Sequence, residues 1–160
     1  MKKILTVSSI AASIAGIILI VGGAWGILFT YTNVAQENIT TPQDASLPNK
    51  PVRGPFTLKA QADIIKKHTL RMTDGKTFAE MPRQIPKLDE MGQLIMDQDG
   101  KPAMVPNALR DTWITATALV TALHLGILTY VFSGIILLFG FVSLWTGVVF
   151  WVLSRSHNKN

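Results

Sequence analysis

The chain has 160 residues, a formal net charge of +5 and no cysteine, and 48% of its residues are hydrophobic. Without cysteine it can form neither disulfides nor thiolate metal sites, and it offers no covalent haem attachment. The charge does not predict a nucleic-acid surface, because all ten acidic residues lie between Glu37 and Asp111, beside eleven basic ones. The other four basic residues stand at the chain ends, which is typical of membrane orientation; they are Lys2, Lys3, Arg155 and Lys159.

The N-terminal stretch Ile4–Thr30 follows two lysines and is apolar throughout. A basic start before an apolar run is also the pattern of a secretory signal, but this run is longer than a typical signal core and lacks a clean cleavage site after it. A bilayer core needs about 20 apolar helical residues. We therefore predict a retained transmembrane helix, with residues 1–31 as the first domain.

The stretch Thr112–Ser154 contains no Lys, Arg, Asp or Glu and is roughly twice as long as one bilayer crossing requires. We predict one long helix over residues 112–154, embedded in the membrane from about residue 130, with its first half projecting from the outer surface. The alternative is a hairpin of two crossings that turns near Ser133-Gly134. That arrangement would place the basic C-terminal tail outside.

Small residues recur at helical spacing in both apolar stretches, at steps of three and four in the first and of seven in the second. Such spacing keeps them on one side of a helix, and helices in membranes associate by close backbone approach along small residues. We predict a helix-packing seam, by which the two helices pack antiparallel on each other or each packs on a larger host. Its residues are Ser9, Gly16, Gly23, Gly126, Ser133, Gly140 and Gly147.

The basic chain ends predict the orientation of the chain. Loops on the cytoplasmic side carry an excess of Lys and Arg, and no basic residue lies between Tyr31 and Asn49. We therefore expect a plasma-membrane protein with both termini in the cytoplasm. Residues from about 32 to 111 would be extracytoplasmic, and residues 155–160 would form a cytoplasmic tail.

The middle segment contains signals for three small elements. Residues 31–53 are rich in Thr, Asn, Gln and Pro and predict an extended linker without its own core. Apolar residues at helical spacing predict a helix over Thr57–Met72 that Asp74-Gly75 ends. A hairpin is expected over about 93–105 around Asp99-Gly100, and Asn107 is a plausible N-cap for the long helix. The expected fold class is therefore a mostly α membrane protein: two transmembrane helices, the second protruding, with a small helical and hairpin segment between them.

The polar residues show no catalytic or metal-binding pattern, so we expect no catalytic residue, cofactor or metal. His68, His124 and His157 lie on different predicted elements, whereas zinc and non-haem iron need convergent ligands. Asp97 and Asp99 beside Gly100 resemble part of a calcium loop. Pro106 stands where that loop requires Glu, so a turn is the better interpretation.

The segment VRGPFTLKAQADIIKKHTL at residues 52–70, continued by GKTFAE at 75–80, resembles a family of small actinobacterial membrane proteins. Members have a membrane helix at each end and an outside segment between, and they are often labelled aromatic ring-opening dioxygenase. In size and layout the chain is also similar to accessory subunits of the actinobacterial respiratory supercomplex. That assembly joins quinol:cytochrome c reductase and cytochrome c oxidase.

These resemblances imply a non-catalytic accessory subunit of a large membrane complex, with that supercomplex as the first candidate. Its partners would be integral membrane subunits and the lipid bilayer, with no nucleic acid, and electron transfer would be carried by the partners. Two alternatives belong to other classes. One is a free-standing envelope protein whose outside segment binds a partner, lipid or wall component, and the other is an enzyme of the labelled dioxygenase class.

Overall fold

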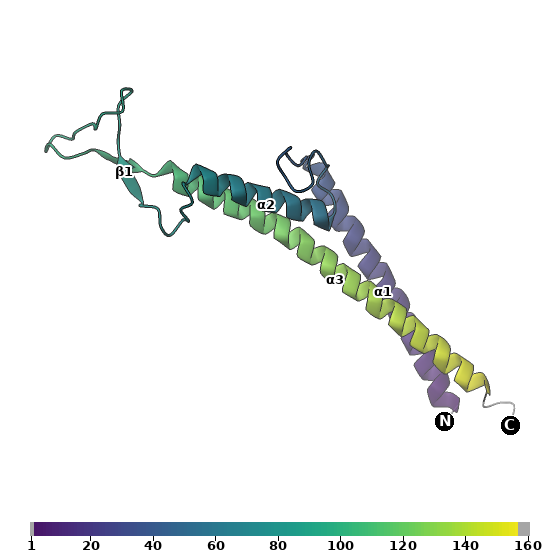
Figure 1. Ribbon diagram of the computed structural model, residues 1–160. Helices are drawn as coiled ribbons and strands as arrows, with labels where there is room; N and C mark the ends of the chain where they lie inside the picture. The colour runs from purple at the N-terminus through teal and green to yellow at the C-terminus, as the bar shows by residue number, and fades with distance from the viewer. Residues whose placement is uncertain (1, 157–160) are drawn as a thin grey trace. The chain divides into compact units, whose positions relative to one another are not determined.

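The computed structural model describes residues 2–156 and is mostly helical. In chain order its elements are helix α1 (Lys2–Gln36), helix α2 (Pro55–Met72), strand β1 (Gln84–Pro86), strand β2 (Met104–Pro106) and helix α3 (Ala108–Ser156). Figure 1 shows the helices as the dominant elements. The two short strands follow α2 and precede α3 along the chain. α1 and α3 are each long and apolar enough to cross a membrane.

Helix α1 continues past the predicted boundary at residue 31 and ends at Gln36. Residues 31–36 contain no Gly or Pro that would break the helix. Its polar side chains bond back to the preceding turn, as Thr32 Oγ1 donates to Leu28 O at 3.0 Å and Asn33 Nδ2 donates to Phe29 O at 2.7 Å. The first residue with a left-handed backbone is Asn38, at φ 51°.

The segment predicted as an extended linker belongs to α1 over residues 31–36 and then forms a closed loop, so that prediction is wrong. Thr40 pairs with Pro51 in an antiparallel bridge, and Val52 N donates to Ile39 O at 2.9 Å. Thr41 is buried inside the loop, where its hydroxyl donates to Leu47 O. A composition rich in Thr, Asn and Pro therefore forms a compact turn here, because its backbone groups find partners within the loop.

Helix α2 begins at Pro55, two residues before the predicted start. Proline suits the first helical position, and the Thr57 hydroxyl accepts the amide of Gly54 at 3.1 Å and that of Arg53 at 3.0 Å. The helix ends at Met72, as predicted. Gly75 closes it with φ +77° and a bond from its amide to Leu70 O at 2.7 Å.

Helix α3 is a single helix of 49 residues. Asn107 caps its start, as predicted, because its Oδ1 accepts the Leu109 amide at 3.1 Å. The helix continues without interruption through Ser133 and Gly134, so the alternative of a turn between two crossings there is wrong. It includes Arg155 and Ser156 of the predicted tail, whereas residues 157–160 lie outside the described part of the chain.

The chain divides into two compact units. The helix-pair unit contains residues 2–40, 50–58 and 125–156, and so holds α1 and the C-terminal part of α3. The middle unit contains residues 41–49 and 59–124, and so holds most of α2, both strands and the N-terminal part of α3.

Candidate functional site

The first candidate site is the contact between α1 and the C-terminal part of α3, which run side by side in opposite directions in Figure 1. The buried residues of α1 are seven apart, and so are those of α3 from residue 125 onward. Seven-residue spacing on both helices is the geometry of a left-handed antiparallel pair. These residues are Ser9, Gly16, Gly23 and Thr30 on α1, and Ser133, Gly140, Gly147 and Ser154 on α3.

The two helix backbones approach too closely for any side chain at the central glycines. A Cβ atom on Gly16 would lie 2.7 Å from the Leu144 backbone nitrogen and 2.8 Å from Gly140 O. A Cβ on Gly23 would lie 2.9 Å from Ser133 O, and one on Gly147 would lie 3.1 Å from Ser9 O. The structure thus places six of the seven predicted seam residues against the opposite helix of the same chain.

Hydroxyl groups bond across the same contact. Ser9 Oγ donates to Gly147 O at 2.7 Å, and Ser143 Oγ donates to Ala12 O at 2.8 Å. The hydroxyls of Thr6 and Ser154 lie 2.8 Å apart near the ends of the two helices. Each bond joins a serine or threonine to a partner on the other helix, so these four hydroxyls are satisfied within the pair.

Gly140 completes the central contact, whereas Gly126 meets a different element. A Cβ on Gly140 would lie 2.7 Å from Ile20 Cγ1, but one on Gly126 would lie 3.3 Å from Leu58 Cδ1 in α2. Leu58 is 1% exposed. Gly126 therefore receives the first turn of α2, and sequence spacing alone did not distinguish this role from a place between α1 and α3.

The second candidate site is a three-armed ribbon formed by residues 84–106. Three backbone bonds close a ring at its centre: Lys87 N donates to Ala103 O at 2.7 Å, Ala103 N to Ile95 O at 2.8 Å, and Ile95 N to Lys87 O at 3.0 Å. One arm is the antiparallel pair β1–β2, with Ile85 opposite Val105. The other two arms are loops closed by the bridges Leu88–Leu94 and Met96–Pro102.

The two loop arms have the same hydrogen bonds. Asp89 Oδ1 accepts the amides of Met91 and Gln93 at 2.9 and 2.8 Å, and Asp97 Oδ1 accepts those of Asp99 and Lys101, both at 2.9 Å. Each turn has a glycine with positive φ three residues after its aspartate: Gly92 at 77° and Gly100 at 73°.

The predicted hairpin over about 93–105 is present in its inner part, where Met96 pairs with Pro102 around the turn at Asp99-Gly100. Its outer part is wrong, because β2 pairs with residues 84–86, which lie before that range. The missed signal was an eight-residue repeat of Asp-x-x-Gly, at residues 89–92 and 97–100. It also explains the calcium-like spacing, because the Asp97 carboxylate is occupied by backbone amides of its own turn.

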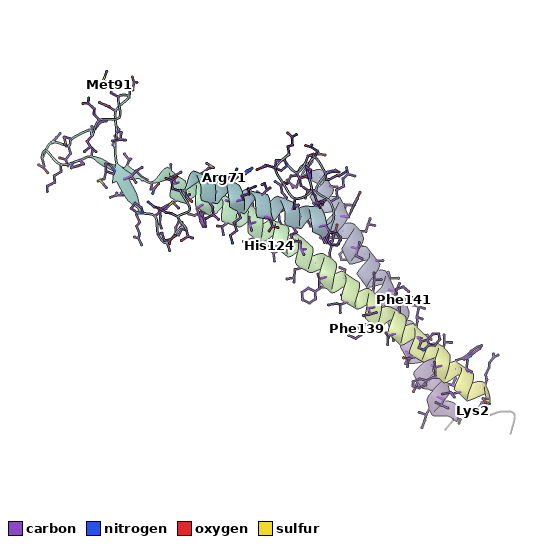
Figure 2. All side chains as sticks on the ribbon, viewed as in Figure 1. Lys2, Arg71, Met91, His124, Phe139 and Phe141 are labelled. Carbon is purple, nitrogen blue, oxygen red and sulfur yellow. The ribbon has the colours of Figure 1, made fainter. Side chains whose placement is uncertain are left out.

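The ribbon exposes large apolar side chains although it is short and rich in turns. Met91 is 85% exposed and stands out at the tip of its arm in Figure 2. Exposed apolar groups gathered on one element mark interaction surfaces. We call this set the ribbon's apolar residues: Ile85, Leu88, Met91, Leu94, Met96 and Met104.

The base of the ribbon is fixed to the first turn of α3. Asn107 Nδ2 donates to Pro82 O at 3.0 Å. Arg110 Nη1 donates to Phe78 O at 2.8 Å and to Met81 O at 2.6 Å, and its guanidinium lies 3.7 Å from the centroid of the Phe78 ring. These contacts order the chain on the N-terminal side of β1.

Two of the three histidines, His68 and His124, lie in the described part of the chain. His68 Nε2 lies 2.8 Å from Asp44 Oδ2, which Lys67 also approaches at 3.8 Å, and this hydrogen bond holds the pKa of the Asp44 carboxyl below its ordinary 3.8. His124 is exposed, and His157 is outside the described residues. Within residues 2–156, no three His, Asp or Glu side chains lie close enough together to hold a metal ion.

A hollow of about 210 Å³ lies between α2 and the N-terminal part of α3 in the middle unit. Ligand pockets for small molecules usually measure about 300–1,000 Å³, so this one is small. Thr117 and Thr121, which are four residues apart on α3, both line it. The remaining lining residues are Lys66, Thr69, Trp113, Ala116 and Val120.

No protein-family model, curated protein or solved structure matches this chain. The class that the fold defines is a mostly helical protein with two long apolar helices, each able to cross a membrane. Its two sites are a tightly packed antiparallel helix pair and an exposed ribbon.

Proposed function

We propose that this chain is a membrane-anchored, non-catalytic accessory subunit of a larger integral-membrane complex. In this proposal α1 and the C-terminal part of α3 cross the bilayer as a pair, with both chain ends in the cytoplasm. The segment between the helices lies on the outer side and contacts partner subunits. The respiratory supercomplex of quinol:cytochrome c reductase and cytochrome c oxidase is the first partner to test, because the layout of the chain is similar to that of its accessory subunits.

The observation that supports a partner is the exposure of the ribbon's apolar residues. The cyclic backbone bonds at Lys87, Ile95 and Ala103 hold the three arms in one arrangement before any partner binds. A preorganised surface loses little conformational entropy on association. Methionine and leucine side chains on such a frame adapt to the shape of an apolar partner surface.

The small-residue seam has a different role in this proposal from partner docking. Apart from Gly126, its glycines pack against the other helix of the same chain, so they make the helix pair a compact anchor. Glycines that face away from the pair remain open, as Gly22 and Gly134 have no atom within 4 Å of a Cβ placed on them. Contacts with a partner in the membrane would therefore involve outer faces of the helices rather than the seam.

The test is purification of the tagged full-length protein from its native membrane in mild detergent, followed by mass spectrometry. We expect subunits of one membrane complex to co-purify with the unaltered chain. Leu88→Glu combined with Met91→Glu should lower their yield at least tenfold, because losing buried apolar anchors costs about 2 kcal/mol or more. Gln93→Glu combined with Gln98→Glu adds the same charge to the same ribbon and should leave the yield unchanged.

Three results would contradict the proposal. Undiminished co-purification in the Leu88 and Met91 double variant would remove the ribbon as the contact surface. Absence of any stoichiometric partner would favour a free-standing envelope protein. Stoichiometric iron in the purified chain would favour the dioxygenase class instead.

A further inference from the structure

One outer face of the helix pair differs from the rest because it carries large apolar residues along its length and cations at one end. On α1 this face carries three residues that are seven apart: Lys3, Ile10 and Ile17. They directly follow Lys2, Ser9 and Gly16, which have the spacing of the seam. On α3 the residues that directly follow Gly140, Gly147 and Ser154 are Phe141, Val148 and Arg155. Since α3 runs in the opposite direction, the position after the seam falls on the same side of the pair in both helices. We call this side the Lys3–Arg155 face.

Two apolar grooves lie on this face. The first, of about 370 Å³, runs between the helices and is bordered by Ile10, Ile14, Ile17 and Trp151, with Ser9, Ser13 and Gly147 at its floor. The second, of about 550 Å³, follows α3 along Phe141, Val142, Leu144 and Trp145. Val148 borders both grooves and separates them. In Figure 2, Phe141 projects from one side of α3 and Phe139 from the other.

The cations stand at the end of the grooves where α1 begins and α3 ends. The Arg155 guanidinium lies 4.0 Å from the centroid of the Trp151 ring, which borders the first groove. The Thr6 and Ser154 hydroxyls, 2.8 Å apart, hold the two helix ends together beside it. The sequence contains no Asp or Glu before Glu37 or after Asp111, so neither membrane stretch carries a carboxylate that would compete for these cations.

We propose that the Lys3–Arg155 face is a binding site for an anionic phospholipid with two acyl chains. The phosphate would be held by Arg155 and Lys3, and one acyl chain would lie on each side of Val148. The 14 helical steps from Phe141 to Arg155 span about 21 Å, which matches one leaflet of a bilayer whose core is about 30 Å thick, plus its headgroup layer. This inference rests on the membrane insertion in the proposed function.

The chemistry of the face favours a lipid over another helix. Helices in membranes approach one another along small residues, whereas this face carries Ile, Phe, Val and Trp. The position before the seam on α1, on the opposite side of the pair, has the smaller set Ser8, Ala15 and Gly22. A cation at the headgroup level also gives selectivity for anionic lipids, which an apolar helix face would not require.

The test measures tryptophan fluorescence of the full-length protein in phosphatidylcholine vesicles. Trp25→Phe and Trp113→Phe leave Trp145 and Trp151, both of which border the grooves. A minor fraction of brominated phosphatidylglycerol or brominated phosphatidylcholine then acts as the quencher. We expect phosphatidylglycerol to be enriched at the site about fivefold or more over phosphatidylcholine, from the attraction of one or two cations near the surface.

Lys3→Gln combined with Arg155→Gln should remove this enrichment and leave equal quenching by the two lipids. Lys76→Gln combined with Lys87→Gln makes the same change in charge away from the face and should retain the enrichment. Native mass spectrometry of the purified protein gives a second measurement. An anionic lipid should stay bound to the parent protein and be lost only from the Lys3 and Arg155 double variant.

Two outcomes would overturn the inference in distinguishable ways. Equal quenching by both lipids in the parent protein would show that the helices are inserted but bind no anionic lipid, leaving the face to bulk lipid or to a partner. No quenching by either lipid would show that the helices are not in the bilayer and would overturn the proposed membrane anchor as well.

Discussion

Gly16 and Gly140 lie directly opposite each other in the antiparallel helix pair. A Cβ on Gly16 would lie 2.8 Å from Gly140 O, and a Cβ on Gly140 would lie 3.1 Å from Gly16 O. Neither distance leaves room for a side chain, because the obstructing atoms belong to backbone and cannot rotate away. The reciprocal contact sets the distance between the two helices.

Gly16→Leu should therefore separate the helices and destabilise the pair by about 1–3 kcal/mol or more, the usual cost of overpacking. Because the chain has no cysteine, the pair can be monitored by a disulfide between Thr6→Cys and Ser154→Cys, whose parent hydroxyls lie 2.8 Å apart. The Gly16→Leu variant should form this disulfide in much lower yield. Gly22→Leu, which enters open space, is the matched control. Equal yields in the two variants would show that the seam does not hold the pair.

Ser9→Ala should have a smaller effect than Gly16→Leu. It removes the bond from Ser9 Oγ to Gly147 O but leaves the close approach intact. Hydrogen bonds between membrane helices contribute about 0.6 kcal/mol on average, so thermal unfolding in detergent should shift only slightly. Thr146→Ala, whose hydroxyl bonds to Val142 O within its own helix, serves as the control. A loss from Ser9→Ala as large as that from Gly16→Leu would show that polar bonds dominate.

Gly100→Ala should destabilise one arm of the ribbon by about 1–2 kcal/mol, because Gly100 has φ +73° and an L-residue with a Cβ is strained there. Amide exchange should increase in residues 96–102 and much less in the arm at Asp89 and Gly92. Gly54→Ala is the control, since the backbone of Gly54 is not left-handed and its Cβ would meet nothing. Exchange that rises equally in both arms would indicate that the central ring had opened.

Arg110→Gln should release the chain before β1. The guanidinium donates to the carbonyls of Phe78 and Met81, and hydrogen bonds from a charged donor contribute about 1.5–3 kcal/mol. Amide exchange of residues 78–83 should rise while that of α1 stays unchanged. Arg71→Gln, at an exposed position on α2 that is labelled in Figure 2, removes the same charge and should have little effect. Protection of residues 78–83 in the Arg110 variant would contradict this role.

The contact between Asp44 and His68 should weaken in acid. The pKa of the Asp44 carboxyl is lowered, chiefly by the His68 hydrogen bond, so the contact stabilises the fold above the ordinary pKa of 3.8. This stabilisation is lost as the pH falls through the lowered value. Amide exchange of residues 41–49 should therefore rise at low pH in the parent chain, and His68→Ala should show that faster exchange already at neutral pH. Identical pH profiles in the two would rule out the contact as the cause.

The sequence alone determined the features that depend on neighbours along the chain. Two uncharged apolar stretches predict two long helices, and a small residue at every seventh position predicts a narrow seam, because both patterns follow from the helical repeat. The N-cap at Asn107 and the stop at Gly75 are likewise set by local hydrogen bonding and backbone freedom.

Only the tertiary structure decided which distant segments meet. It shows that Gly16 packs against Gly140 and that Gly126 packs against Leu58. It also shows the ring of backbone bonds at Lys87, Ile95 and Ala103. A periodic pattern shows that a face will be buried but does not identify the surface that buries it. That choice depends on the length of chain between the segments and on the fit of two surfaces, and neither is encoded in any single stretch of residues.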